Sequence, residues 1–184
     1  MTVTLLRGSD LIGRAVVDAS TGEALAEIRD IVFSSGRGAI TGFTLRRLGF
    51  FGRRLKTVLP VGALLSVGTD AVMVADSGAI ADPADIPANM VSERSNDVIK
   101  DDVLTVSGRS LGTVRDVVIL GGPDPRVVGF EIGGGQVGQG LIPLGAQAAV
   151  SGSALVVPDD FEQRIRSDLT GLAAELALIE GGQA

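Results

Sequence analysis

The sequence contains no cysteine, histidine, tryptophan or tyrosine among its 184 residues. Without imidazole or thiolate groups, the usual zinc, haem and iron–sulfur sites cannot be built, and neither can a Ser-His or Cys-His nucleophile. The polar groups that remain are carboxylates, Lys, Arg and hydroxyls. We therefore predict that the protein is not an enzyme and has no catalytic, cofactor-binding or metal-binding residues.

Long apolar runs are also missing. No window approaches the roughly 18 uncharged apolar residues that a membrane span requires, and the apolar stretch near the N-terminus, MTVTLLRGSDLIG, is too short for a signal peptide. The lack of cysteine excludes a disulfide framework. These features predict a cytoplasmic protein with no membrane span, and they leave peripheral contact with a membrane open.

Aromatic residues make up only 3% of the chain, although 45% of it is hydrophobic. The core must therefore consist mainly of Val, Ile, Leu and Ala. The 26 glycines and 7 prolines imply many tight turns. This composition favours short strands, and the length suits one ordinary domain or two small ones.

An internal repeat organises the chain. Residues 21–45 reappear as residues 107–132, with one residue inserted near Pro125, and residues 58–74 reappear as residues 141–157. The identical pairs in the first stretch are Gly22/Gly108, Leu25/Leu111, Arg29/Arg115, Asp30/Asp116, Val32/Val118, Gly42/Gly129 and Phe43/Phe130. In the second stretch, Pro60-x-Gly62-Ala63 corresponds to Pro143-x-Gly145-Ala146.

Each repeat has the pattern of five short strands separated by glycine-rich turns. In the first repeat we expect strands at residues 14–18, 26–33, 39–47, 53–60 and 71–75, with a short helical turn before the last. Closure of such a sheet into a barrel removes its exposed edges. The predicted fold is mainly β, with two tandem small β-barrels at residues 1–76 and 96–158, a linker at 77–95, and a C-terminal helix and tail at 159–184.

The glycine turn and strand at residues 22–31 and 108–117, with the proline segments at 59–63 and 142–146, resemble the PRC-barrel domain family. The likeness covers about residues 7–76 and 96–158. The family includes the cytoplasmic domain of the photosynthetic reaction-centre H subunit, the C-terminal domain of a ribosome-maturation factor, and small stand-alone proteins of the YlmC/YmxH group. The resemblance implies two PRC-type β-barrels that act as a binding or assembly module, not as a catalyst.

Two glycine motifs match chemical signatures by their spacing. Residues 108–112 fit the Gly-x-Ser-x-Gly nucleophile elbow, but they lead into a strand, and Ala24 replaces Ser110 in the first repeat. Residues 133–138 have the spacing of a dinucleotide-binding loop, but another strand follows where that loop needs a helix. We interpret both segments as hairpin turns.

The repeated pairs Arg29-Asp30 and Arg115-Asp116 occupy strands, where neighbouring side chains point to opposite faces. The residues of each pair are therefore not partners of one another. We expect each carboxylate to accept backbone N–H bonds from an adjacent turn, because no second carboxylate stands nearby to form an acid/base pair.

Positive charge is concentrated in the first repeat, although the whole chain has a net charge of -6. Residues 1–76 contain nine Lys/Arg against seven Asp/Glu, whereas residues 77–184 contain seven against fifteen. Five of the nine cations fall in residues 46–56, which we call the basic hairpin. Its predicted partner-binding residues are Arg46, Arg47, Phe50, Phe51, Arg53, Arg54 and Lys56. The equivalent loop of the second repeat, residues 133–140, is shorter and uncharged.

The basic hairpin therefore predicts a docking point for an anionic partner, which could be an acidic protein surface, a lipid head-group layer or RNA. In the alternative interpretation, the two phenylalanines fold back onto a barrel, and the arginines are solvated or paired with the acidic second half. An acidic chain of this kind is not a general nucleic-acid binder, so RNA would bind only to a local basic patch.

The periodicity changes at the C-terminus. Apolar residues spaced by three and four predict one amphipathic α-helix over residues 158–180, stopped by Gly181. Its apolar stripe consists of Phe161, Ile165, Leu169, Leu172, Leu176 and Ile179. The helix either packs on its own barrels or mediates a homodimer.

These observations favour a non-catalytic adaptor or structural module that docks a macromolecular partner, most simply a protein. The alternative function is an RNA- or ribosome-associated assembly factor that uses the basic hairpin. The dependence of binding on salt separates the two, because contacts to phosphates weaken steeply as salt rises.

Overall fold

The structure is a computed structural model that describes residues 4–33, 39–49, 53–82, 84, 98–135, 138–144, 149–151 and 154–181. The chain divides into two compact units. The first unit comprises Met1–Ser95 and Leu120–Arg126, and the second comprises Asn96–Ile119 and Val127–Ala184. Phe50 and Phe51 lie outside the described residues.

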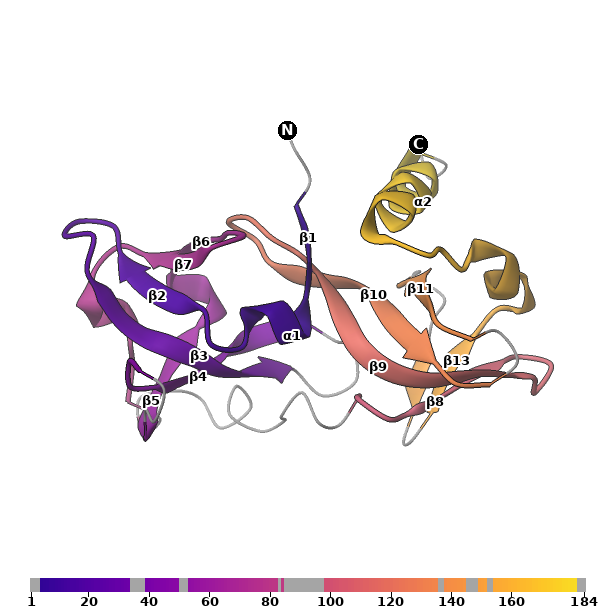
Figure 1. Ribbon diagram of the computed structural model, residues 1–184, viewed down its shortest axis with the longest axis horizontal. Coiled ribbons are helices and arrows are strands. Elements are labelled where there is room, and N and C mark those ends of the chain that lie inside the picture. The colour runs from indigo at the N-terminus through magenta and orange to yellow at the C-terminus, as the bar shows by residue number, and fades with distance from the viewer. Residues whose placement is uncertain are drawn as a thin grey trace. The chain divides into compact units, whose positions relative to one another are not determined.

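Short strands dominate both units (Figure 1). The first unit contains β1 (Leu5–Arg7), α1 (Gly8–Leu11), β2 (Ala15–Asp18), β3 (Ala24–Phe33), β4 (Ile40–Arg46), β5 (Arg54–Pro60), the 3-10 helix η1 (Val61–Ala63), β6 (Leu64–Val67), β7 (Ala71–Val74) and the 3-10 helix η2 (Ser77–Ala79). The later elements are β8 (Asp102–Thr105), β9 (Ser110–Leu120), β10 (Arg126–Gly133), β11 (Gly140–Pro143), β12 (Ala149–Ser151), β13 (Ala154–Val157), the 3-10 helix η6 (Asp159–Arg164) and α2 (Leu169–Gly181).

The two repeats share one strand topology. Hydrogen-bonded strands run in the order β5-β4-β3-β2-β7-β6 in the first repeat and β11-β10-β9-β8-β13-β12 in the second. In each repeat the first of these strands in the sequence pairs in parallel with the last, so Ala15 lies opposite Ala71 and Asp102 lies opposite Ala154. The predicted mainly β fold and its internal repeat are confirmed.

Each repeat has six paired strands, so the prediction of five is wrong. The strand that the sequence did not reveal is β6, with β12 as its equivalent. The expected helical turn is present as η1, but it is only three residues long, and the chain extends again to pair antiparallel with β7. Four residues of mixed polarity are too short to show a strand period.

The sheets are not closed into barrels by strand pairing, which corrects the predicted closure. In the described residues the six strands of each repeat form an open path, with β5 and β11 at equivalent edges. Instead, each edge is covered at one position by backbone from the segment that follows the last strand of the same repeat. Val58 and Ala81 exchange two N–H to C=O bonds, of 3.0 and 2.9 Å, and Leu141 and Arg166 do the same at 2.7 and 2.8 Å.

We call residues 77–81 and 159–166 the return segments, because each leads the chain back to the edge of its own sheet. Val58 and Leu141 occupy equivalent positions of the sequence repeat. Each return segment begins with a 3-10 helix, η2 or η6. The structural repeat is therefore longer than the repeat visible in the sequence.

The core of each repeat is mainly aliphatic, and the repeated phenylalanine, Phe43 or Phe130, which we call the central phenylalanine, is almost fully buried. A repeated glycine next to that residue allows two strands to approach closely. A Cβ on Gly42 would lie 2.6 Å from the Leu59 carbonyl oxygen, and a Cβ on Gly129 would lie 2.5 Å from the carbonyl oxygen of Ile142. Any side chain at these two positions would push the strands apart.

The prediction of one continuous C-terminal helix is wrong. The 3-10 helix η6 ends at Arg164, and the chain is extended where Arg166 pairs with Leu141. Helix α2 then begins after Asp168, whose carboxylate accepts the Gly171 N–H at 2.8 Å as an N-cap does. The break follows because a backbone paired with β11 cannot continue a helix. Helix α2 is described up to Gly181.

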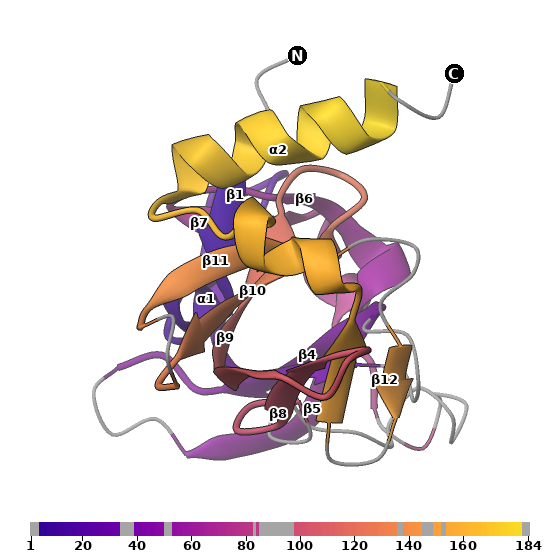
Figure 2. The same ribbon diagram turned by 90° about the vertical axis from the view of Figure 1, so that its right-hand side faces the viewer.

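Helix α2 packs on its own unit, beside β11 (Figure 2). From the predicted apolar stripe, Phe161 and Leu172 are buried and the other four residues are partly buried, while Leu178, off the stripe, is 72% exposed. The chain thus uses the stripe for internal packing.

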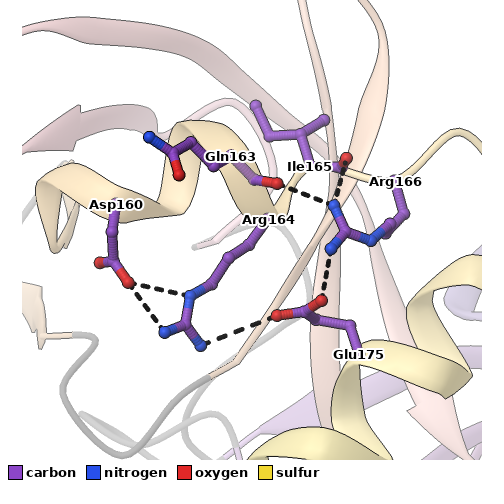
Figure 3. Close-up of polar contacts among 6 residues, drawn as sticks. All are labelled: Asp160, Gln163, Arg164, Ile165, Arg166 and Glu175. Carbon is purple, nitrogen blue, oxygen red and sulfur yellow. Dashed lines mark hydrogen bonds and ion pairs between the residues drawn. The ribbon is translucent and has the colours of Figure 1, made fainter.

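A buried carboxylate fixes α2 to the return segment (Figure 3). Glu175 receives the Arg166 guanidinium at 2.5 Å and lies 3.7 Å from that of Arg164. Arg164 also binds Asp160, and Arg166 donates to the carbonyl oxygens of Gln163 and Ile165. Two cations therefore compensate for the burial of one acid.

Candidate functional site

The pairing of β4 with β5 brings the arginines of the basic hairpin together. Arg46, the last residue of β4, lies opposite Arg54, the first residue of β5. One step further, the Arg47 N–H donates to the Arg53 carbonyl oxygen at 3.0 Å. The arms of the hairpin are thus paired up to its tip, which places four guanidinium-bearing residues in two adjacent pairs.

Four of the five cations are exposed, namely Arg47, Arg53, Arg54 and Lys56. Within the part of the chain that the structure describes, no ion pair involves any of them. Leu48, between the arms, is 49% exposed. The described part of the hairpin thus presents charge next to an apolar side chain.

The fifth cation, Arg46, is engaged within the first unit. Its Nε lies 2.8 Å from Glu27 Oε2, and the other Glu27 oxygen accepts the Gly49 N–H at 3.1 Å. The Arg46 side chain is 33% exposed and that of Glu27 is 18% exposed. Glu27 therefore contacts both the first arm of the hairpin, at Arg46, and the residue Gly49 beyond it. Arg46 thus helps to fix the base of the hairpin. Its partner is in β3, not in the acidic second half.

The second repeat shows what replaces this support when the hairpin is short. Thr113 and Gly133 are the residues equivalent to Glu27 and Arg46 in the sequence repeat. The Thr113 hydroxyl donates to the Gly133 carbonyl oxygen at 3.2 Å. The same cross-strand position is thus a neutral hydrogen bond in one repeat and an ion pair in the other, and the ion pair accompanies the long, charged hairpin.

A family model of the PRC-barrel domain matches the chain twice, at residues 4–79 and 90–164. The protein belongs to the PRC-barrel domain family. No curated protein matches the chain. PRC-barrel domains are typically protein-interaction modules and are generally non-catalytic. Among the residues that the structure describes, no helix is both long enough and apolar enough to span a membrane.

In the described residues, both motifs with chemical spacing border on strands of these PRC-barrel domains and lead into strands, as expected. Ser110 is the first residue of β9, so it stands at the entry to a strand and not at a strand-to-helix elbow. The glycine string begins at the last residue of β10, and the next element described is the strand β11, so the described residues offer a pyrophosphate no helix N-terminus here.

The repeated aspartates make equivalent contacts in the two PRC-barrel domains. Asp30 accepts the Ile31 N–H at 2.9 Å, and Asp116 accepts the Val117 N–H at 2.8 Å. Each carboxylate thus accepts a hydrogen bond from the backbone N–H of the next residue of its own strand, which is a structural role.

Other acids organise the first turn of each PRC-barrel domain, and the sequence analysis missed them. Asp18 accepts the hydroxyl and N–H of Ser20, at 2.6 and 2.8 Å, and the Ser20 hydroxyl is the main cause of its lowered pKa. In the second domain Asp159 of the return segment accepts the Ser107 N–H at 3.0 Å, and Ser107 likewise lowers its pKa. The Asp-x-Ser-Thr pattern at residues 18–21 is the signal that could have revealed the first of them.

Proposed function

We propose that this PRC-barrel protein is a non-catalytic adaptor that docks an anionic partner protein through the basic hairpin. The observation that carries the proposal is the group of four exposed cations on one hairpin, Arg47, Arg53, Arg54 and Lys56, for which the described residues provide no ion-pair partner. If these four cations had a structural role, they would need an ion-pair partner within the described part of the fold, and they have none there.

The support beneath these cations favours recognition over mere solvation. Glu27 fixes Arg46 and the Gly49 backbone, so the base of the hairpin is ordered before a partner arrives. Pre-ordered binding groups lose less conformational entropy when they bind. Arginine also suits the purpose, because its planar group pairs with carboxylates through two parallel bonds.

Charge balance favours an acidic protein over a nucleic acid. The first 76 residues have a net charge of +2, which the five hairpin cations create, while the rest of the chain has -8. A long polyanion would meet the repulsion of that remainder, whereas a compact acidic surface can contact the hairpin alone. Cation-rich patches of this size steer association from a distance of roughly a Debye length, about 10 Å at 0.1 M salt.

The proposal is tested by affinity capture with the full-length protein as bait in extracts of its native cells, with and without nuclease. The informative variant replaces Arg47, Arg53 and Arg54 with Ser and leaves Arg46 in place. Arg29→Ser is the matched control, because Arg29 is an exposed arginine of β3 outside the hairpin. We expect the triple variant to lose a protein that the wild type and the control retain after nuclease treatment.

Equal capture by the triple variant would overturn the proposal. A partner that disappears with nuclease and weakens steeply with salt would instead support the RNA-associated alternative.

A further inference from the structure

The outer edge of β5 is longer than the segment that covers it. Ala81 of the return segment pairs with Val58, near the C-terminal end of the strand. The strand extends back from there to Arg54, whereas its equivalent β11 begins at Gly140, directly before the paired Leu141. The basic hairpin thus adds a stretch of edge strand that the second repeat does not have.

Hydrogen bonds at both ends show which backbone groups face this edge. Val58 directs its N–H and C=O to Ala81 and hence away from β4. At the other end Arg53 accepts from Arg47 of the facing arm, so Arg53 faces the arm and Arg54 faces away. Successive residues of a strand alternate in direction. The backbone groups of Arg54 and Val58 therefore face the same edge. Lys56 lies midway between them, in the stretch where β5 has two more residues than the facing part of β4.

The second residue after Ala81 is a proline, which limits how far the return segment itself can extend this ladder. In an antiparallel ladder that pairs Val58 with Ala81, the next residue to exchange two bonds with β5 would face Lys56 and would be Pro83. Proline has no N–H to donate to the Lys56 carbonyl oxygen. Among the described residues, no backbone bond covers this edge of Arg54 or Lys56, so a further strand can extend the ladder that Ala81 begins.

The side chains on this edge select the strand that can be added. Arg54 and Lys56 are exposed, whereas Leu55 between them is partly buried, so both cations lie on the outer face of the sheet. Charged residues on edge strands usually prevent association. Here they oppose pairing with the β5 strand of a second copy, because like charges would meet, and they favour a strand that carries carboxylates.

We propose that β5 binds its partner by strand addition, in which an extended acidic segment pairs antiparallel with Arg54–Lys56 and continues the ladder begun by Ala81. Backbone bonds supply affinity in this mode, and alternate side chains supply specificity. The inference rests on the proposed function and specifies the form in which the partner binds.

The test uses a short peptide of alternating Glu and Val and two N-methylated forms of it, each titrated into the full-length protein. Peptide residues that exchange backbone bonds with Lys56 and Arg54 lie directly opposite them, so their side chains point to the same face of the sheet as the two cations. Glu should occupy these positions, because its carboxylate then meets the cations. The N–H groups that donate to β5 are therefore those of the Glu residues. We expect methylation of the Glu nitrogens to weaken binding about tenfold, the effect of losing one or two hydrogen bonds, and methylation of the Val nitrogens to have little effect.

A second measurement locates the peptide on the protein. Binding of the unmodified peptide should slow amide hydrogen exchange at Arg54 and Lys56 about tenfold and leave exchange at Arg29 unchanged. The double variant Arg54→Glu, Lys56→Glu should abolish binding, while the control Arg29→Glu should bind like the wild type.

The possible outcomes separate the two proposals. Equal affinity for all three peptides would overturn strand addition and leave electrostatic docking intact, since docking by charge alone needs no backbone bonds. Failure of all three to bind at low salt would also overturn strand addition. The proposed function would still stand if the Arg47, Arg53, Arg54 triple variant lost its captured partner.

Discussion

Glu175 and Arg166 form a hydrogen-bonded ion pair of 2.5 Å in which the carboxylate side chain is only 9% exposed. Their pairing joins α2 to the return segment that covers β11. The Arg166 backbone meanwhile pairs with Leu141, so one residue connects the helix to the sheet edge through its side chain and its main chain.

Replacing Glu175 with Gln should therefore destabilise the protein by about 1–3 kcal/mol, because two cations lose their shared buried acid. Urea unfolding measures the change. The matched control is Glu162→Gln, which breaks the exposed pair with Arg109 and should cost less than about 1 kcal/mol. Equal effects of the two substitutions would show that burial of Glu175 is not important.

The cap of α2 predicts a pH dependence. The Gly171 N–H, followed by the Ser167 hydroxyl, lowers the pKa of Asp168 below its ordinary value. A carboxyl with a lowered pKa in the folded state stabilises the fold above its unfolded pKa of about 3.9, and this contribution is lost as the pH falls through the folded pKa. Asp168→Asn keeps a capping group that does not titrate. We expect its acid unfolding curve to be shallower than that of the wild type below about pH 4, and an unchanged curve would contradict the role of Asp168.

The support of the basic hairpin can be measured by a double-mutant cycle. Glu27→Ala and Arg46→Ala should each destabilise the protein, and the double variant should be less destabilised than the sum, with a coupling of about 0.5–1.5 kcal/mol. Additive effects would mean that the pair does not act as a unit. Arg54→Ala paired with Glu27→Ala is the control, and it should show no coupling.

The two phenylalanines of the basic hairpin distinguish docking from packing. Replacing Phe50 and Phe51 with Ser should weaken capture of the partner strongly and should change the free energy of unfolding by less than about 0.5 kcal/mol. A loss of about 3–5 kcal/mol in stability, the range for buried Phe, with capture unchanged would show that both side chains belong to the core. Urea unfolding of the same purified variant supplies the comparison.

The repeated glycines next to the central phenylalanines should tolerate no side chain. Gly42→Ala and Gly129→Ala should each cost about 1–3 kcal/mol, because the added methyl group would overlap a carbonyl oxygen of the neighbouring strand. Gly62→Ala is the control. A Cβ at Gly62 meets no atom within 4 Å, so its effect on urea unfolding should stay within about 0.5 kcal/mol.

The sequence predicted the features that repeat. Gly22 and Gly108, or Gly42 and Gly129, recur because the same backbone geometry is needed twice, and comparing the two halves exposes them without a structure. The same comparison showed that residues 46–56 are an addition to the first repeat. The shared topology and the candidate hairpin were therefore accessible at once.

The features that escaped prediction depend on distant pairing. Glu27 supports the hairpin because strand register places it opposite Arg46, and a period-2 pattern does not reveal register. Ala81 and Arg166 cover equivalent edges through backbone atoms alone, so their side chains need not resemble one another. The charge of Glu175 likewise gave no sign that it would be buried, because its two cations come from a separate segment.

The parallel pairing of β2 with β7 determines when the sheet of the first unit can be completed during synthesis. Val16 and Val72, which lie opposite each other, are fully buried, yet they come from the first and last strands of the sheet. While β7 is still inside the ribosome, β2 therefore lacks the neighbouring strand on one of its edges. An exposed apolar strand of this kind invites pairing with other chains. Translation that stops before Val74 should yield a fragment that needs a chaperone, while a stop after the first return segment leaves the sheet whole.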